Sequence, residues 1–244
     1  MGRLDNKIAI VTGAAQGMGA SHATRFIEEG AKVVLTDLNE EKGLALAESL
    51  GENALFIKHN VTSEEDWANV IQKAEEAFGP VNVLVNNAGI SMNKGLQDLT
   101  LDDYRKIVDI NQVSVFLGMK AVIPSMQKAE SGSIVNISSM NGLVAGVVGY
   151  TDTKFAVRGM TKAAAIELAA YGIRVNSVHP GVISTPMIQQ GDAKKAIEEF
   201  SKFIPLKRIA QTEEVSNMVL FLASDDSSYS TGSEFVIDGG LTAQ

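Results

Sequence analysis

The sequence predicts an α/β fold: a doubly wound, seven-stranded parallel sheet flanked by helices, in a single domain over residues 1–244. Two observations lead to this prediction. Short apolar runs of strand length alternate with helical patterns from one end of the chain to the other. The runs are also continuously apolar, as strands that are covered on both faces must be.

The strands are predicted from runs that are rich in β-branched residues. The first run is KIAIV, and Val, Ile and Leu dominate the others as well. These side chains pack well on a pleated sheet and lose rotamer freedom in a helix. The predicted strands are residues 7–11, 32–36, 54–58, 81–85, 133–138, 173–178 and 234–238.

Helices are predicted between the strands, where apolar residues recur at helical spacing. Thr62 or Ser63 can cap the third helix, whose acidic first turn suits the positive end of the helix dipole. The predicted helices are residues 18–29, 40–50, 63–78, 101–126, 150–170 and 212–223.

One interval interrupts this alternation. Residues 184–204 combine turn residues with a short amphipathic pattern between the sixth and seventh predicted strands. A segment at this place projects beyond the carboxyl ends of the strands, where open α/β sheets bind their ligands. We therefore expect a substrate-binding excursion there.

Composition and charge exclude several classes of protein. With 244 residues, 45% hydrophobic and 20% charged, the chain is typical of a globular protein. The absence of cysteine excludes disulfides, thiolate metal sites and cysteine nucleophiles. A net charge of -8 argues against nucleic acid or a membrane surface as the main partner. With no signal segment and no continuous apolar run of spanning length, we expect a cytoplasmic protein.

Three glycines follow the first predicted strand in TGAAQGMG, namely Gly13, Gly17 and Gly19. Glycines at a strand-to-helix turn let backbone N–H groups and the helix N-terminus approach a pyrophosphate. Asp37 ends the second predicted strand, where a carboxylate can bind the adenosine ribose hydroxyls and would repel a 2′-phosphate. Because no Arg or Lys lies within the glycine turn or directly after Asp37, the pattern predicts a Rossmann-type site for NAD(H) rather than NADP(H).

A tyrosine and a lysine lie four positions apart in YTDTK, at the start of a predicted helix. At this spacing Tyr150 and Lys154 face the same side of the helix. A positive charge near the phenol favours the phenolate, which makes a tyrosine with an ordinary pKa near ~10 usable as an acid and base. Ser138 and Ser139 end the fifth predicted strand, where a hydroxyl can donate to a substrate carbonyl oxygen.

Together these motifs resemble the short-chain dehydrogenase/reductase family over essentially the full length of the chain. The resemblance extends to NNAG, to the Ile110 and Asn111 pair, to the ISS strand end and to PGVISTP. Within the family the chain is similar to the alcohol dehydrogenases and carbonyl reductases of lactic acid bacteria. The resemblance implies an NAD(H)-dependent oxidoreductase that interconverts a secondary alcohol and a ketone by hydride transfer.

The resemblance also assigns a role to each matching position. Tyr150 would be the general acid for carbonyl reduction and the base for alcohol oxidation, and Ser139 would hold the carbonyl oxygen. Lys154 would bind the nicotinamide ribose and lower the pKa of Tyr150, while Asn111 would hold a water in a proton relay. The implied cofactor-binding residues are Gly13, Gln16, Gly17, Met18, Gly19, Asp37, Leu38, Asn60, Val61, Asn87, Ala88, Gly89, Tyr150, Lys154, Pro180, Gly181, Ile183 and Thr185.

Two departures from the family pattern affect the site. Relatives usually place the serine slightly further from the tyrosine, so the loop 140–149 is shortened and Ser138 is the alternative to Ser139. Asn60 stands where an aspartate near the adenine is common. The expected substrate-lining residues are mostly apolar, which favours a hydrophobic ketone, diketone or steroid-like alcohol. They are Met140, Val144, Met187, Ile188 and Phe200.

The resemblance further implies an assembly. Family membership predicts a homotetramer, with residues 101–126 and 150–170 as its natural interfaces. The tail resembles that of bacterial alcohol dehydrogenases in which a terminal glutamine helps to bind a structural magnesium ion between subunits. Gln244 is therefore a candidate metal ligand.

Other functions remain open at this point. Within the enzyme class, a 3-oxoacyl-thioester reductase or a hydroxysteroid dehydrogenase is possible, and Asp37 counts against the first because such reductases prefer NADP. A non-catalytic NAD(H)-sensing protein would not need the Asn, Ser, Tyr and Lys set. A hydrolase using Ser139 and His179 lacks the G-x-S-x-G nucleophile motif. The scattered His22, His59 and His179 do not form a metal-binding pattern, and we expect His179 to be structural or to lie beside the cofactor.

Overall fold

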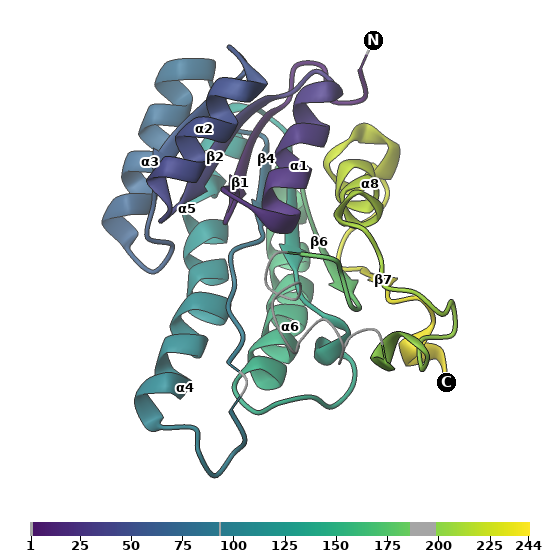
Figure 1. The fold of residues 1–244 in the computed structure, drawn as a ribbon. Helices are drawn as coiled ribbons and strands as arrows, with labels where there is room; N and C mark the ends of the chain where they lie inside the picture. The colour runs from purple at the N-terminus through teal and green to yellow at the C-terminus, as the bar shows by residue number, and fades with distance from the viewer. Residues whose placement is uncertain (1, 93, 186–198) are drawn as a thin grey trace.

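The computed structural model describes residues 2–92, 94–185 and 199–244 (Figure 1). Its strands are β1 (Ile8–Thr12), β2 (Lys32–Asp37), β3 (Ala54–Lys58), β4 (Val83–Asn86), β5 (Gly132–Ile137), β6 (Ile173–Pro180) and β7 (Glu234–Ile237). Its α-helices are α1 (Gly17–Glu28), α2 (Glu40–Leu50), α3 (Glu64–Phe78), α4 (Leu101–Val108), α5 (Ser114–Lys128), α6 (Tyr150–Leu168) and α8 (Thr212–Ala223).

The strands form one parallel sheet in the order β3-β2-β1-β4-β5-β6-β7. Strands β2 and β3 lie on one side of β1. The chain then returns to the middle of the sheet, and β4 to β7 follow in order on the other side of β1. The order therefore reverses between β1 and β4, which is where an open α/β sheet forms its ligand crevice. The predicted α/β fold with seven parallel strands is confirmed.

Strands β1 to β6 contribute to two hydrophobic cores, one on each face of the sheet, and β7 contributes to one of them. Within β1, Val11 belongs to the core that α1, α2 and α8 cover, whereas Ile10 belongs to the core that α3, α5 and α6 cover. Phe26 of α1 is fully buried in the first core, and Trp67 of α3 is almost fully buried in the second. Burial on both faces explains why the strands lack the polar alternation of a sheet with one wet side.

Most element boundaries lie within two residues of the predicted ones, and Ser63 rather than Thr62 caps α3 by accepting from the backbone N–H of Asp66 at 3.1 Å. The predicted helix over residues 101–126 differs more. A π-helical turn, Asp109–Val113, separates α4 from α5. Within this turn the side chain of Asn111 bonds the backbone of Ile90 in a neighbouring loop, so the wider turn coincides with a tertiary contact.

By length and hydropathy, the helical stretch Leu101–Lys128 could cross a membrane. About 44% of its most apolar window is buried inside this structure, and α5 packs on α3 and on β4 and β5. A core helix passes the same test of length and composition. The apolar character of α5 is therefore accounted for by its position against the sheet.

Only the two ends of the expected excursion over residues 184–204 are described, since residues 186–198, including Met187 and Ile188, lie outside the described part of the chain. At one end Ile183 forms a parallel bridge with Ala210, and the N–H of Ser184 donates to the carbonyl of Ala210 at 2.8 Å.

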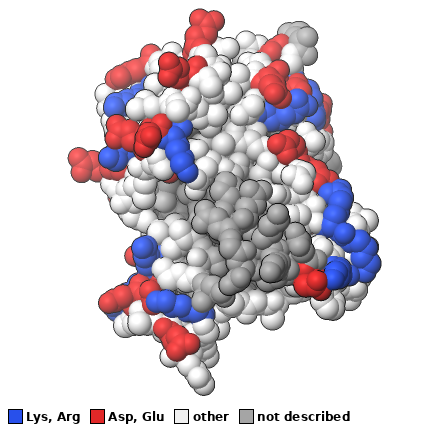
Figure 2. Space-filling view, in the orientation of Figure 1, with Lys and Arg blue, Asp and Glu red and all other residues white. Residues whose placement is uncertain are grey.

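Figure 2 shows acidic and basic side chains interspersed around the edge of one face of the molecule.

Two histidines are buried on opposite sides of the sheet and are held neutral. His22 places Nδ1 2.8 Å from the hydroxyl of Ser216, between α1 and α8, and burial lowers the pKa of His22 from 6.5 to about 3. His59 places Nδ1 3.0 Å from the hydroxyl of Thr36; burial lowers the pKa of His59 to about 4, against the opposing charge of Asp66. Both Nε2 atoms are buried without a hydrogen-bond partner among the described residues.

These histidines predict a loss of stability in mild acid. Below pH 6.5 the unfolded chain binds protons on both side chains and the folded chain does not, so the free energy of unfolding falls with the pH until the folded pKa values are reached. Between pH 7 and 5 we expect each histidine to remove roughly 2 kcal/mol. Denaturant unfolding at the two pH values measures this. His22→Leu should shrink the difference by roughly 2 kcal/mol whatever its stability at pH 7, and an unchanged difference would contradict the assignment.

Candidate active site

A cavity of about 450 Å³ lies at the carboxyl ends of the central strands, where the strand order reverses. It is lined by most of the residues that the resemblance implied, namely Gly13, Gln16, Gly17, Met18, Gly19, Asp37, Leu38, Asn60, Val61, Asn87, Ala88, Gly89, Tyr150, Lys154 and Thr185. Pro180, Gly181 and Ile183 are not among the lining residues. Sequence reasoning missed His59, Ile90, Ser91, Ile110 and Ile137, which also line it.

The glycine turn forms a cradle that excludes side chains. Gly13 has φ +65°, which favours glycine, and a Cβ on Gly13 would lie 2.9 Å from Cα of Ala88. A Cβ on Gly19 would lie only 2.2 Å from the carbonyl oxygen of Gly13. The N-cap residue of α1, Gln16, makes no side-chain capping bond, so the first N–H groups of the helix are open to an anion.

At the other side of the turn, Asp37 has a fixed orientation. Its Oδ2 accepts from the N–H of Ala15 at 3.1 Å and its Oδ1 accepts from the N–H of Asn39 at 2.9 Å. Each carboxylate oxygen can still accept another hydrogen bond, as two ribose hydroxyls require. Asn87 donates from Nδ2 to the carbonyls of Thr12 and Gly13, and its buried Oδ1 has no hydrogen-bond partner in the described part of the chain. This donor and acceptor set, with the glycine cradle, fits NAD(H).

Lys154 is the most deeply buried charged group of the site, at 4% exposure. Its Nζ donates to the carbonyl of Ile137 at 2.9 Å and lies 5.5 Å from the centre of the Tyr150 ring. Burial lowers the pKa of Lys154 from 10.5 to about 8. The fold thus brings Tyr150 and Lys154 together at one wall of the cavity, as their spacing predicted.

The phenol of Tyr150 differs from the expectation in one respect. Burial raises its pKa above the ordinary 10.0, and a hydrogen bond with Ser139 opposes the rise. Burial is the larger of these two effects, so the pKa of Tyr150 is raised, whereas we expected it to be lowered. At neutral pH the phenol therefore carries its proton.

The two serines at the end of β5 have different partners. The hydroxyl of Ser138 donates to the backbone carbonyl of Lys154 at 2.9 Å, which ties the end of β5 to α6. Ser139 is close enough to the Tyr150 phenol to oppose the rise in its pKa, and the Ser139 hydroxyl accepts from the N–H of Asn141 at 3.1 Å. The hydroxyl next to the phenol is thus that of Ser139, although Ser138 is the serine that lines the cavity.

His179 supports this arrangement from β6. Its Nδ1 lies 3.0 Å from the carbonyl oxygen of Ser139 and its Nε2 lies 2.8 Å from the hydroxyl of Ser177. Because a carbonyl only accepts, Nδ1 carries the hydrogen and Nε2 accepts from Ser177. Burial lowers the pKa of His179, in keeping with this neutral form. His179 is therefore a structural residue behind Ser139, as we expected.

Asn111 in the π-helical turn holds the loop that follows β4. Its Oδ1 accepts from the N–H of Ile90 and its Nδ2 donates to the carbonyl of Ile90, both at 2.8 Å. A Cβ on Gly89 would lie 3.3 Å from this Oδ1 and 3.5 Å from Nζ of Lys154. Asn111, Gly89 and Lys154 are therefore neighbours, which the sequence separation alone did not show. The predicted proton-relay role of Asn111 stays a prediction.

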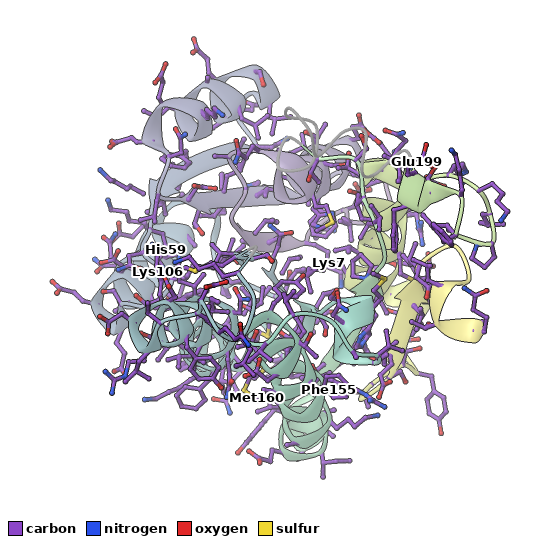
Figure 3. All side chains as sticks on the ribbon, turned by 60° about the horizontal axis from the view of Figure 1, so that its bottom comes forward. Lys7, His59, Lys106, Phe155, Met160 and Glu199 are labelled. Atoms are coloured by element: carbon purple, nitrogen blue, oxygen red, sulfur yellow. The ribbon has the colours of Figure 1, made fainter. Side chains whose placement is uncertain are left out.

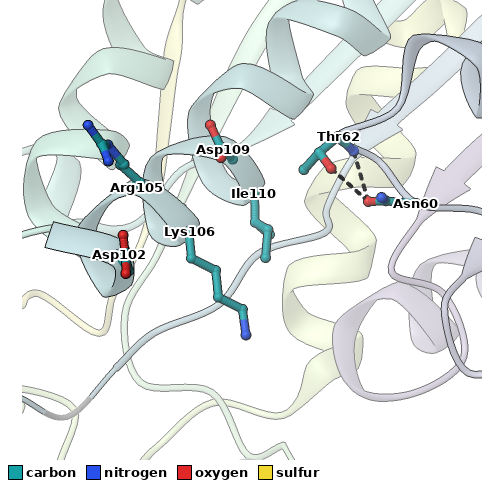
Figure 4. Close-up of a pocket in the computed structure, with 7 residues that line it drawn as sticks. All are labelled: Asn60, Thr62, Asp102, Arg105, Lys106, Asp109 and Ile110. Carbon is teal, nitrogen blue, oxygen red and sulfur yellow. Dashed lines mark hydrogen bonds between the residues drawn. The ribbon is translucent and has the colours of Figure 1, made fainter. Parts of the chain in front are cut away.

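A smaller cavity of about 280 Å³ adjoins the first and shares Asn60 and Ile110 with it (Figure 4). Its other lining residues are Thr62, Asp102, Arg105, Lys106 and Asp109. The Oδ1 of Asn60 accepts from both the N–H and the hydroxyl of Thr62. Figure 3 shows Lys106 on the same side of the molecule as His59, which lines the larger cavity.

The predicted metal ligand lies apart from both cavities. Gln244 is exposed at the end of the chain. Within the described ranges, His, Asp and Glu side chains form no group of three or more that could hold a metal ion.

Comparison with known proteins identifies the family. A family model described as enoyl-(acyl carrier protein) reductase matches residues 13–242. The chain is 48% identical to a 3-alpha-(or 20-beta)-hydroxysteroid dehydrogenase of Mycobacterium tuberculosis, over 99% of this chain and 92% of the relative. It is 48% identical to a cyclopentanol dehydrogenase of Comamonas testosteroni over 100% of both chains. It is 45% identical to a trans-4-hydroxycyclohexanecarboxylate dehydrogenase of Sinomonas cyclohexanicum, over 99% of this chain and 95% of the relative.

The chain therefore belongs to the short-chain dehydrogenase/reductase family, as its motifs indicated. It is an NAD(H)-dependent oxidoreductase that interconverts a secondary alcohol and a ketone. The alternative of a sensor without catalytic activity is set aside by this result.

The cradle predicts a specific effect of Gly19→Ala. The added Cβ would overlap the carbonyl of Gly13 at 2.2 Å, so the turn must open. We expect NADH affinity to fall at least about tenfold and the free energy of unfolding to fall by roughly 1–3 kcal/mol. Nucleotide fluorescence titration and denaturant unfolding measure the two effects. Gly159→Ala in α6 is the control, because a Cβ there meets nothing within 4 Å; equal NADH affinity in both variants would contradict the cradle.

The serine partners predict different effects for their two alanine variants. Ser139→Ala removes the hydroxyl that bonds the phenol, so we expect kcat to fall by about 10²-fold. Because that hydrogen bond lowers the pKa of Tyr150, its loss should shift the half-maximal pH of alcohol oxidation upward. Ser138→Ala removes a bond to a backbone carbonyl and should mainly lower stability, by about 1 kcal/mol. A larger kcat effect in Ser138→Ala would reverse the assignment.

Proposed function

We propose that Tyr150 is the general acid and base of this oxidoreductase, with Ser139 and Lys154 as its partners. The observation that supports this most is the placing of these groups. The buried Lys154 ammonium and the phenol, both on α6, line the cavity that also contains the glycine turn and Asp37, and Ser139 after β5 lies next to the phenol. A nucleotide bound across the crevice would therefore end at the phenol.

The residues of the chain divide the work of holding the cofactor. The N-terminus of α1 and the glycine turn bind the pyrophosphate, and Asp37 accepts from the adenosine ribose hydroxyls. Lys154 donates to the nicotinamide ribose and keeps it beside Tyr150. The cofactor supplies the hydride, while the protein orients it and excludes water.

Tyr150 handles the proton. In ketone reduction the phenol gives its proton to the carbonyl oxygen as negative charge develops there, and Ser139 donates a second hydrogen bond to the same oxygen. In alcohol oxidation the phenolate takes the proton from the hydroxyl. Because burial raises the pKa of Tyr150, the acid form prevails at neutral pH and the site favours reduction there. Oxidation should gain as the pH rises.

The substrate that fits best is a cyclic secondary alcohol or its ketone. Val144 and Phe200 are large apolar side chains that remain partly exposed, at 42% and 39%, on the segments expected to border the substrate. The relatives are dehydrogenases of a 3-alpha-(or 20-beta)-hydroxysteroid, of cyclopentanol and of trans-4-hydroxycyclohexanecarboxylate, and each of these compounds contains a ring. Reduction of an acyl thioester is less favoured, because Asp37 opposes the 2′-phosphate of NADP(H).

Assembly as a homotetramer is part of the proposal. The large apolar side chains Phe116 of α5 and Phe155 and Ile166 of α6 are 49%, 40% and 80% exposed, and Figure 3 places Phe155 on α6. Burial of these faces against other subunits would remove that apolar surface from water. A structural magnesium ion at Gln244 and a cytoplasmic location remain expectations. A metal at Gln244 would need ligands from another subunit.

The test follows NADH absorbance at neutral pH with a panel of cyclic ketones, linear ketones, a diketone and a ketosteroid, each repeated with NADPH. We expect turnover with NADH, and kcat/KM for cyclic ketones at least about tenfold above that for linear ketones of the same carbon number. Absence of turnover with every ketone would refute the proposed activity. A preference for linear ketones would refute only the substrate class.

Tyr150→Phe tests the role of the phenol. The ring and its packing stay and the hydroxyl is lost, so we expect kcat to fall by at least about 10²-fold, with NADH affinity close to that of the wild type. Tyr104→Phe is the matched control, because its hydroxyl bonds Asp152 at 2.6 Å on the surface and does not line the cavity. Equal rates in Tyr150→Phe and wild type would exclude the mechanism.

A further inference from the structure

A lysine reaches the adenosine end of the cavity from a neighbouring helix. Lys42 lies in the first turn of α2, and its Nζ donates to Oε1 of Gln16 at 2.9 Å. Gln16 is the N-cap of α1 and lines the cavity together with Asp37. Lys42 lies neither within the glycine turn nor directly after Asp37, where a basic residue would favour NADP(H). The start of α2 returns the chain toward the turn and brings Lys42 to Gln16.

The backbone around Lys42 fixes where the side chain begins. The N–H of Lys42 donates to Oδ1 of Asn39, the N-cap residue of α2, at 3.1 Å. The N–H of Asn39 in turn donates to Oδ1 of Asp37 at 2.9 Å. Asp37, Asn39 and Lys42 are thus linked in one short turn, which carries the carboxylate and the ammonium to the same end of the cavity.

The charge of Lys42 has no ionic partner among the described residues. Its hydrogen-bond acceptor, Gln16, is neutral. Of the acidic residues just before it in sequence, Glu40 pairs with Lys58 at 3.2 Å and Asp37 accepts backbone N–H groups. The adjacent Glu41 is exposed and forms no ion pair within the described part of the chain. An ammonium that is held only by an amide oxygen can exchange that bond for a charge-assisted bond to an anion.

We propose that Lys42 is a specificity-determining residue that binds the 2′-phosphate of NADP(H), and that Asp37 is the group which opposes this binding. The inference rests on the proposed placing of the adenosine ribose at Asp37. A 2′-phosphate replaces the hydroxyl that Asp37 accepts, so it would lie between this carboxylate and the Gln16 side chain that holds Lys42. The preference for NAD(H) is then a balance between one carboxylate and one ammonium, not the absence of a phosphate site.

Direct binding tests the balance without turnover. Affinities for NADH and NADPH are measured by nucleotide fluorescence in the full-length protein, for wild type, Asp37→Ser, Lys42→Gln and the double variant. Asp37→Ser should raise NADPH affinity relative to NADH at least about tenfold. In the Asp37→Ser background, Lys42→Gln should lower NADPH affinity about tenfold and NADH affinity much less. The contribution of Lys42 to NADPH affinity should also fall between low salt and 0.5 M salt, because salt screens the attraction between the exposed ammonium and an exposed 2′-phosphate.

Lys58→Gln is the matched control in the Asp37→Ser background. Lys58 is the partner of Asp37 in the β2–β3 register, so its substitution removes an equal positive charge close to Asp37. Unlike Lys42, however, Lys58 already forms an ion pair with Glu40. Equal losses of NADPH affinity in Lys58→Gln and Lys42→Gln would mean a general field effect and would overturn the proposal. So would an unchanged NADPH affinity in the Lys42→Gln double variant.

Two further measurements keep the outcomes separate. If Asp37→Ser does not fold, the binding of 2′,5′-ADP and of 5′-ADP is measured with wild type and with Lys42→Gln. Lys42→Gln must then lower the affinity for 2′,5′-ADP and leave that for 5′-ADP largely unchanged. An equal loss of affinity for both nucleotides overturns the inference. If wild type binds neither NADH nor NADPH, the proposed cofactor site itself fails. If it binds NADH and Lys42→Gln changes nothing for NADPH, only the role of Lys42 fails.

Discussion

The burial of the Lys154 ammonium is the constraint on which the rest of the site depends. Removing an ammonium from water costs several kcal/mol unless the surroundings compensate. Here the carbonyl of Ile137 accepts from Nζ, and the Tyr150 ring lies 5.5 Å away. The backbone carbonyl of Lys154 is itself tied to Ser138. Strand β5 and helix α6 must therefore meet in one arrangement, which is the arrangement that places a serine and a tyrosine side by side.

The same burial sets the electrostatic character of this end of the cavity. It lowers the pKa of Lys154 to about 8 and raises that of Tyr150, so each group is moved toward its neutral form. A lysine beside a tyrosine can favour the phenolate only when its field exceeds the desolvation of that phenolate. In this structure desolvation is the larger effect. Ser139 is the group that opposes it, and neutral His179 holds the backbone of Ser139 in place.

The sequence was sufficient for the fold and for most of the cavity, because both follow from local patterns. Continuous apolar strands and the glycine turn each determine a structure within a few residues. What the sequence did not show depends on contacts between distant segments. The π-helical turn coincides with the bond from Asn111 to Ile90, a contact between segments that are distant in the sequence. The choice between Ser138 and Ser139 required their hydrogen-bond partners, and the direction of the Tyr150 pKa required its burial.

The two ends of the cavity consequently differ in how a substitution acts on them. At the nicotinamide end each polar group is buried and holds the next, so the loss of one leaves another unsatisfied, at a cost of roughly 1–3 kcal/mol. At the adenosine end, Asp37, Gln16 and Lys42 stand near solvent, where water and salt screen their charges. Exposed pairs are worth only about 0.2–1 kcal/mol each. Cofactor preference can therefore change through one surface charge, whereas the position of the acid–base group depends on the packing of β5 against α6.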